Sequence, residues 1–264
     1  MKKEELKNVA EEHKKEIKVY KSRNNLVVKS NELIQKASYE LSAQEQKILL
    51  YIISKLKPND TDFNIVELKM KEFCDVCGIT FKSGANYNEI EKSLKELKNK
   101  NCELKTKKEV LLFHWLGTVK IDKVNNKIYV AFDTMLKPYL LQLYSNFTAY
   151  QLENILIMDS KYSIRIYELL LSVKAIGYYK TTVSDLKKML GCENKYSRFN
   201  NFRQKVLSIS IKEINEYTDI NVNTEYEKNE SGETEDIIFN IVEKTTDEKN
   251  KAFEKRYKLL NKID

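Results

Sequence analysis

Glycine and proline, which add flexibility or interrupt regular secondary structure, are scarce in this sequence, with 6 glycines and 2 prolines among 264 residues. This scarcity excludes collagen-like repeats and glycine-rich flexible linkers. Long apolar runs are missing too, because the longest, ILLYII at Ile48–Ile53, is far shorter than the ~20 residues that span a bilayer. The opening residues, MKKEELK, are charged and lack the apolar core of a signal peptide. We therefore expect a cytoplasmic protein that does not engage a membrane.

Cysteine and histidine are also few. The four cysteines are Cys74, Cys77, Cys102 and Cys192, and without an export signal we expect no structural disulfides. Cys74 and Cys77 have zinc-knuckle spacing, but no second Cys/His pair accompanies them, so half-buried helix cysteines are the better interpretation. The two histidines, His13 and His114, are far apart in the sequence. A rolling-circle nickase needs a close histidine pair for its metal ion, and these two cannot form one.

Other catalytic motifs are equally hard to find. The sequence has no glycine-rich phosphate loop of the Walker type and no spacing that indicates a Ser-His-Asp set. The acidic stretch Asp60–Asp62 follows Pro58–Asn59 and is typical of a turn rather than a metal site. His114 is expected in a strand. We therefore predict a protein that is not an enzyme and that holds no metal and no cofactor.

Basic residues outnumber acidic ones by 46 to 39, which gives a formal net charge of +7. A balance of this size hints at a polyanionic partner, but the position of the charge matters more. The stretch NKYSRFNNFRQKV, Asn194–Val206, carries four cations and no acid. Aromatic residues and two adjacent asparagines lie between the cations.

The first half of the chain alternates helical and strand patterns. Ser42 and Glu45 form a capping box that begins a core helix reaching about Lys57. FNIVELKMKEFCDVCGI predicts a short strand and then a helix that ends at Gly78. NYNEIEKSLKELKNKNCEL predicts another helix, with Asn86 as its cap and Ile90, Leu94 and Leu97 on one stripe. Two strands joined at Asn125–Asn126 follow. A helix-turn-helix followed by a β-hairpin is a winged helix.

The second half repeats this order. A helix from Ser160 to about Ala175 ends at Gly177, and the strand YYKTTV follows it. Thr182 and Asp185 cap a short helix, and a long helix covers Ser197–Asn215. The strands DINVNTEYE and DIIFNIVEK close the unit around the loop Lys228–Glu235. A short match between VELKMKEFC and VSDLKKMLG also hints at a duplication.

This pattern predicts an α+β protein of two tandem winged-helix domains, mostly helical, with β-hairpin wings. A 264-residue chain is long enough for two small domains. We expect a charged N-terminal arm at 1–24, an N-terminal winged helix at 25–140, a C-terminal winged helix at 141–245 and a charged C-terminal tail at 246–264.

The helix Ser197–Asn215 is the strongest candidate for contact with DNA. At ~100° per residue, Phe199, Phe202, Val206 and Ile209 share one side and are expected in the core. Amides and hydroxyls occupy the opposite side with cations beside them. Asparagine and glutamine can pair with adenine edges, and arginine and lysine with guanine or phosphate. An ordinary solvated face is the alternative, which the lack of acids and the following hairpin disfavour. The expected DNA-binding residues here are Lys195, Ser197, Arg198, Asn200, Asn201, Arg203, Gln204, Lys205 and Ser208.

The equivalent helix of the first half mixes cations with glutamates. We expect it to grip the DNA backbone through Lys82, Lys92 and Lys95 or to form a dimer surface, and simple solvation stays open. The second wing, EKNESGETED, is acidic, so its tip should point away from DNA or meet a basic partner.

Three stretches then indicate a family. VVKSNELIQKASYELSAQEQKILLYIISKL, FTAYQLENILIMDSKYSIRIYELL and FRQKVLSISIKEINEYTDINVNTEYE resemble the initiator replication proteins of iteron-containing, theta-replicating plasmids. The resemblance covers about residues 25–243. It implies winged helices bound to direct repeats of double-stranded DNA at a plasmid origin, with 197–215 as the recognition helix. It further implies opening of the origin, autoregulation, a possible homodimer through the N-terminal domain, and the host initiator and replicative helicase as partners.

Three functions compete at this point: a plasmid replication initiator, a winged-helix transcriptional repressor and an origin nickase. Two unlike winged helices in tandem favour the initiator, because typical repressors are symmetric dimers of one such domain. The histidine count argues against the nickase. Direct repeats of about two helical turns beside the gene would fit the initiator, and a single palindrome would fit the repressor.

Overall fold

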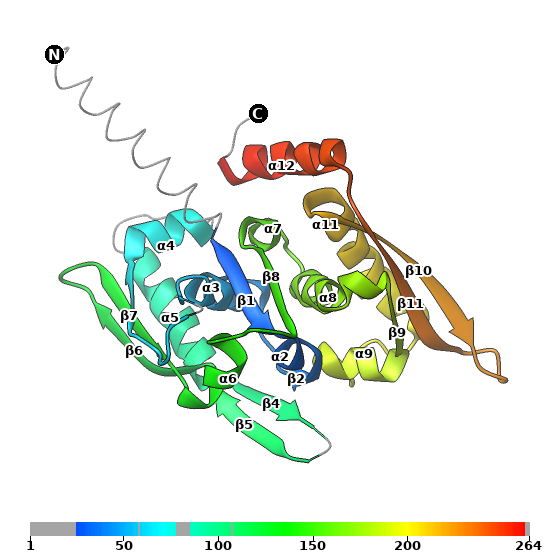
Figure 1. The fold of residues 1–264 in the computed structure, drawn as a ribbon, viewed down its shortest axis with the longest axis horizontal. Helices are drawn as coiled ribbons and strands as arrows, with labels where there is room; N and C mark the ends of the chain where they lie inside the picture. Colours follow the sequence, from blue (N-terminus) through cyan, green and yellow to red (C-terminus); the bar gives the residue numbers. More distant parts are fainter. Residues whose placement is uncertain (1–24, 58, 78–84, 107, 262–264) are drawn as a thin grey trace, which may run out of the picture.

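The computed structural model describes residues 25–57, 59–77, 85–106 and 108–261, and it is an α+β fold in which one set of elements occurs twice. The predicted arm, Lys82 and the predicted helix end at Gly78 lie outside these ranges. The two β-hairpin wings lie at opposite ends of the molecule, and helices α3 (Ala43–Ile53) and α8 (Lys161–Ser172) lie between them (Figure 1).

The first set of elements runs from α3 to β7. It comprises α3 (Ala43–Ile53), β3 (Val66–Lys69), α4 (Met70–Cys77), α5 (Ala85–Asn99), β6 (Leu116–Asp122) and β7 (Lys127–Phe132). The antiparallel sheet has the order β3-β7-β6. The first strand therefore pairs with the last, as a winged helix requires.

The second set repeats this arrangement. It comprises α8 (Lys161–Ser172), β9 (Tyr178–Thr182), α9 (Val183–Met189), α10 (Phe199–Phe202), a π-helical segment (Arg203–Leu207), α11 (Ser208–Tyr217), β10 (Ile220–Lys228) and β11 (Thr234–Glu243). The sheet order is β10-β11-β9, so the first strand again pairs with the last. The predicted fold class, two tandem winged helices with hairpin wings, is confirmed.

The helix boundaries follow the capping signals. Ser42 accepts a hydrogen bond from the Glu45 backbone, and the Glu45 carboxylate accepts one from the Ser42 N–H at 2.7 Å, which completes the capping box. Thr182 accepts from the Asp185 N–H at 2.9 Å. Gly177 takes a left-handed φ of +84° after α8 and the following 3-10 turn, η2 (Lys174–Ile176), a conformation that glycine adopts without steric cost. Helix α3 ends at Ile53, earlier than the expected Lys57.

The chain after α5 departs from the prediction. The predicted helix extended over NCEL, but α5 ends at Asn99 and β4 (Asn101–Lys105) follows. Cys102 and Leu104 are buried while their neighbours are not, so the burial period is two, as in a strand. β4 pairs with β2 (Ala37–Ser38) and β5 (Val110–His114) in a separate sheet of order β2-β4-β5. The run VLLFHWLGTVKI is thus two strands, β5 and β6, that belong to different sheets.

The two stretches of the short sequence match also do not form equivalent elements of the two halves. VELK forms strand β3, whereas VSDL forms the first turn of α9. The repeat is therefore one of element order rather than of aligned residues.

The remaining elements join the two halves. β1 (Leu26–Ser30) leads into α2 (Asn31–Lys36), and the stretch after β7 forms η1 (Thr134–Leu136), α6 (Lys137–Leu140), β8 (Phe147–Gln151) and α7 (Glu153–Leu156). β1 and β8 form a two-stranded antiparallel sheet, so the N-terminal strand pairs with one that follows residue 140. The core is continuous from one half to the other. The boundary that we placed between 140 and 141 stays a prediction.

The charged end of the chain is helical. α12 (Thr246–Asn261) buries Ala252 and Arg256 and lies along α7 and α11 (Figure 1). Arg256 donates to Glu153 at 2.7 Å and to the carbonyl of Tyr217, so its charge is compensated where it is buried. Residues 246–261 are therefore part of the folded body.

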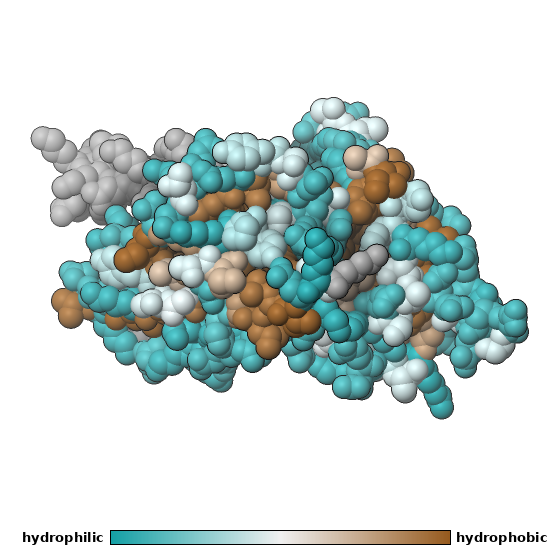
Figure 2. Space-filling view, turned by 60° about the horizontal axis from the view of Figure 1, so that its bottom comes forward, coloured by the Kyte–Doolittle hydropathy of each residue, from teal (hydrophilic) through white to brown (hydrophobic). Residues whose placement is uncertain are grey.

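The surface is mostly hydrophilic. Seen from the side of β4 and β5, hydrophobic residues gather near the middle of the face (Figure 2). No helix in the described ranges is both long and apolar enough to cross a membrane.

Candidate nucleic-acid interface

The predicted recognition helix is a continuous helical run from Phe199 to Tyr217 with a π-helical segment inside it. Phe202 and Val206 are fully buried, as predicted, and Phe199 is partly buried. Ile209 was predicted in the core but is 43% exposed, and Leu207 and Ser210 are buried instead. A π turn accommodates an extra residue, so every position after it rotates relative to a straight α-helix. This rotation is the physical reason for the wrong assignment of Ile209.

The polar side of this helix is open to solvent. Seven exposed polar side chains, on this helix or in the two residues before it, have no hydrogen bond and no ion pair with other described residues: Ser197, Arg198, Asn200, Asn201, Gln204, Lys205 and Ser208. Arg198 occupies the N-cap position, where the helix dipole favours an anion. Amide donors and acceptors therefore lie beside free cations at the N-terminal end of one exposed surface. We call these seven residues the polar face.

Two further predicted residues are partly engaged within the protein. The Arg203 guanidinium lies 5.3 Å from the ring centroid of Tyr226 on β10, so a cation–π contact ties the helix to the wing. Lys195 precedes the helix, and its ammonium nitrogen lies 2.7 Å from a carboxylate oxygen of Glu40 in the first half. Both residues are nevertheless exposed to solvent.

Several contacts hold the helix in place. Lys187 donates to the Tyr196 carbonyl at 2.8 Å and lies over the Phe202 ring, which fixes the start of the helix. At the other end, the buried Lys244 donates to the carbonyls of Asn215 and Thr218 at 2.6 and 2.8 Å. Cations at a helix C-terminus compensate unpaired carbonyls and the helix dipole. The polar face is therefore presented by an element that is anchored at both ends.

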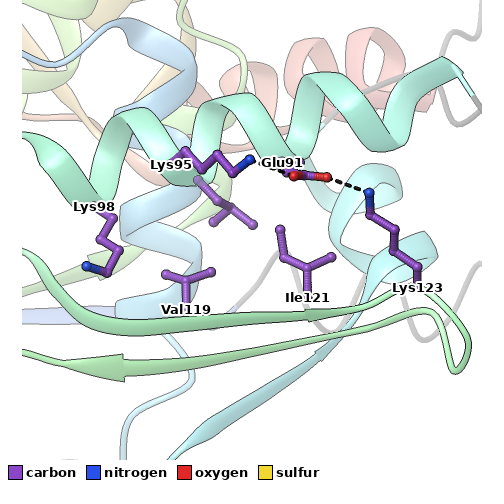
Figure 3. Close-up of a pocket in the computed structure, with 7 residues that line it drawn as sticks. Glu91, Lys95, Lys98, Val119, Ile121 and Lys123 are labelled. Carbon is purple, nitrogen blue, oxygen red and sulfur yellow. Dashed lines mark hydrogen bonds and ion pairs between the residues drawn. The ribbon is translucent and has the colours of Figure 1, made fainter.

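The equivalent helix of the first half, α5, forms one wall of a groove whose other wall is strand β6 (Figure 3). The apolar floor comprises Leu94, Val119 and Ile121, and lysines line the rim. Lys95 and Lys123 both pair with Glu91 at 2.7 Å, and Lys92 lies 3.9 Å from Glu96. The two ammonium groups beside Glu91 lower the pKa of its carboxyl to about 2. Lys92 and Lys95 therefore lie along the same surface of α5. Each is close to a carboxylate, which offsets part of its positive charge and weakens its attraction to an anion.

The acidic second wing is internally organised. Lys180 on β9 pairs with Glu227 at 2.7 Å and with Asp236 at 3.0 Å, so two of its acids are neutralised within the sheet. The side chain of Asn229 accepts from the backbone of Ser231 and Glu233 and shapes the tip. The direction in which the tip meets a partner stays a prediction.

The side chains considered for metal binding and rejected include a buried thiol, a paired carboxylate and an exposed imidazole; the side chain of Cys77 lies outside the described part of the chain. Cys74, Cys102 and Cys192 are buried thiols, and burial raises the pKa of the first two to about 12. Asp62 pairs with Lys137, and His114 lies on the exposed side of β5. Among the described residues, no three His, Cys, Asp or Glu side chains are arranged to hold a metal ion.

Four residues that the sequence did not point to lie beside the candidate site residues. Ile209 and Lys212 are exposed on the continuation of the recognition helix. Lys98 and Lys123 join the rim of the α5 groove. Lys123 was detectable as a cation at the tip of the first hairpin. The exposure of Ile209 carried no sequence signal, because the π segment that causes it has none.

Comparison with known proteins gives the wider context. Residues 26–171 match the family model described as "Initiator Replication protein, WH1", and residues 182–241 match "Initiator Rep protein, WH2". A curated "Replication initiation protein" from Escherichia coli is 29% identical over 208 residues, which is 74% of this chain and 63% of the relative. The chain therefore spans less than two thirds of that relative's length.

A solved structure has the same fold. It is titled "Crystal structure of Pi initiator protein in complex with iteron DNA", and it matches with a TM-score of 0.69 at 18% identity over 84% of this chain and 98% of that one. The class that the fold defines is a protein of two tandem winged helices. Within that class, the chain belongs to the initiator replication protein family whose domains are named WH1 and WH2.

Proposed function

We propose that this chain is a plasmid replication initiator that binds direct repeats at its origin sequence-specifically and starts replication without catalysing a reaction. The observation that carries the proposal is the polar face, an exposed set of amides, hydroxyls and free cations on the second helix of a helix-turn-helix. Membership of the initiator family supports the same role. The Pi initiator, which has this fold, is described in complex with iteron DNA.

The two halves have different tasks in this proposal. The polar face of the second half reads base edges, because asparagine and glutamine side chains form paired hydrogen bonds with adenine in the major groove. The groove beside α5 contacts phosphates through Lys92, Lys95, Lys98 and Lys123. Glu91 and Glu96 lower the positive charge there, so this half contributes less to the total affinity. Lys82 is proposed as a further phosphate contact and lies outside the described residues.

A homodimer through the first half is part of the proposal. β5 is an edge strand of the sheet β2-β4-β5, and Val110 and Leu112 on it are 54% and 68% exposed. An exposed apolar edge strand is a template for pairing with a second copy. Opening of an AT-rich segment, autoregulation and recruitment of the host initiator and the replicative helicase follow from the family and complete the proposed role.

The repressor is the second candidate, and the arrangement of the target DNA separates the two. The test is quantitative binding of the purified chain to the DNA on either side of its gene. The initiator predicts several direct repeats of about two helical turns, each bound by one chain. A single palindrome bound by two chains would instead establish a repressor. Equal affinity for flanking DNA and for a scrambled duplex would contradict both.

A further inference from the structure

A short segment of the first half, Ala37–Glu40, lies against the turn that precedes the recognition helix of the second half. Ser38 donates its hydroxyl hydrogen to the Lys188 carbonyl at 3.1 Å. One carboxylate oxygen of Glu40 lies 2.7 Å from the ammonium nitrogen of Lys195 and 3.1 Å from that of Lys161. The two lysines hold the pKa of the Glu40 carboxyl at about 2, so it stays charged at neutral pH.

The backbone fit between the two parts is also close. Gly191, in the turn, has a φ of +61°, and a Cβ added there would stand 3.0 Å from the Tyr39 carbonyl oxygen. Only glycine allows both the left-handed backbone and this approach. Gly177 has a similar φ of +84° but has no atom within 4 Å of the same added Cβ. The contact at Gly191 is therefore a feature of the joint rather than of the backbone conformation alone.

The segment also contacts both halves away from this turn. In the first half, Ala37 and Ser38 form β2 and pair with Leu104 and Glu103 of β4, and the Tyr39 ring lies 5.1 Å from that of Trp115. From α8 of the second half, the buried Arg165 donates to the Ala37 carbonyl at 2.6 Å, and its guanidinium lies 4.7 Å from the ring centroid of Tyr39. The segment thus connects the sheet of the first half to the start of the recognition helix.

We propose that the Ala37–Glu40 segment is a positioning element that fixes the recognition helix relative to the first half, so that the chain accepts only one spacing between the two parts of its DNA site. This inference rests on the proposed function. Its residues act through the recognition helix and need not touch DNA.

A rigid joint should make the affinity for DNA depend on the number of base pairs between the two parts of the site. One inserted base pair rotates one part of the site by roughly 34° and shifts it by about 3.4 Å relative to the other. A rigid pair of readers loses one set of contacts, whereas a loose pair adjusts. The probe is a duplex carrying one direct repeat, found by footprinting the DNA beside the gene, and the same duplex with one base pair inserted at its centre.

The first test compares Gly191→Ala with Gly177→Ala. Both variants place a side chain on a left-handed backbone, but only the first pushes against Tyr39. We expect the inserted duplex to bind the original chain and Gly177→Ala at least about tenfold more weakly than the intact repeat. For Gly191→Ala we expect weaker binding to the intact repeat and an insertion penalty below about threefold, because the joint can then adjust.

A second variant changes an exposed side chain, so that the inference can be tested even if Gly191→Ala does not fold. Glu40→Gln removes the charge that holds Lys195, and its control, Glu32→Gln, removes the charge from an exposed pair with Lys36 within α2. We expect Glu40→Gln to lose up to about fivefold in affinity for the intact repeat, because exposed ion pairs contribute little. Its affinity for a scrambled duplex should stay level or rise, since Lys195 and Lys161 become free for phosphates.

The outcomes separate this inference from the proposed function. If the original chain does not distinguish the repeat from a scrambled duplex, the proposed function fails and the inference fails with it. If the original chain distinguishes them and Gly191→Ala keeps the same insertion penalty as Gly177→Ala, only the inference is overturned. Equal behaviour of Glu40→Gln and Glu32→Gln on all three duplexes would also count against it.

Discussion

At the residue scale, the interface depends on which polar groups are already satisfied inside the protein. Asn201, Gln204 and Lys205 have no partner among the described residues, so they can meet DNA without losing an internal contact. Lys95 and Lys195 must first leave Glu91 and Glu40. A lysine that must leave a carboxylate in order to contact a phosphate gains less binding free energy than a lysine that has no partner. We therefore rank the free side chains of the polar face above the paired lysines.

Replacement of the amides should affect sequence discrimination. Asn201→Ala and Gln204→Ala should each cost about 1–3 kcal/mol on the direct repeat, because each removes a paired contact with a base edge. Binding to a scrambled duplex should change little. Fluorescence anisotropy titrations measure both, and Gln151→Ala, an exposed amide on β8, is the control. Unchanged binding of both variants to the repeat would show that the polar face is not the reader.

Replacement of the cations should affect all sequences alike. Arg198→Ala and Lys205→Ala should lower affinity for repeat and scrambled DNA to a similar extent. Each lost phosphate contact should reduce the slope of log K against log salt by about 1. Titrations at four or more salt concentrations give the slope. A slope equal to that of the original chain would exclude phosphate contact by that residue.

At the element scale, the sequence determined more of the fold than of the site. Capping signals at Ser42 and Thr182 placed two helix starts, because each uses a side chain that completes an unpaired backbone group locally. The strand β4 was missed because it follows the basic helix α5 almost without a gap in the sequence. Only its pairing with β2 and β5 shows that these residues form a strand and not the end of the helix. The π segment was missed because tertiary packing of Leu207 and Ser210 decides it. Lysine partners such as Glu40 were equally invisible, since they come from the other half of the chain.

The π-helical segment predicts that Leu207 contributes more to the packing than Ile209 does. Leu207→Ala should destabilise the protein by about 2–5 kcal/mol, because a fully buried leucine leaves a cavity. Ile209→Ala should cost less than about 1 kcal/mol, since Ile209 is 43% exposed. Urea unfolding followed by circular dichroism measures both free energies of unfolding. The reverse order would indicate a straight α-helix with Ile209 in the core.

At the scale of the whole molecule, a buried charged cluster joins the two halves. Lys29 on β1 lies 2.5 Å from Glu168 on α8, and both side chains are 1% exposed. Tyr150 on β8 donates to the same carboxylate at 2.6 Å. Burial lowers the pKa of Lys29, and the Glu168 carboxylate opposes that shift. Such a pair favours one arrangement of β1, β8 and α8, because separation would leave charges buried without partners.

Removal of one member of this cluster should be costly. Lys29→Met should lower the free energy of unfolding by about 3–5 kcal/mol, because Glu168 keeps a buried charge that has lost its partner. Lys36→Met, which removes an exposed lysine paired with Glu32, should cost less than about 1 kcal/mol. Chemical denaturation gives both values. Equal costs would show that the buried pair does not stabilise the joint.

The proposed dimer predicts a change in mass. Leu112→Asp should shift the chain toward the monomer, since a carboxylate on the exposed edge strand β5 opposes pairing with a second copy. Val124→Asp, a change at a residue that is 88% exposed at the tip of the first wing, should leave the dimer unchanged. Sedimentation velocity at several concentrations measures both. A shift with Val124→Asp alone would move the interface to the wing.

Sequence-specific reading of direct repeats by the polar face is tested by hydroxyl-radical footprinting of the purified chain on the DNA that flanks its gene. We expect protection of several direct repeats, each with two protected patches about one helical turn apart on one side of the duplex. The patch read by Asn201 and Gln204 should disappear in the double alanine variant while the protein remains folded. Uniform protection without repeats, or a pattern that the double variant leaves intact, would contradict reading by the polar face.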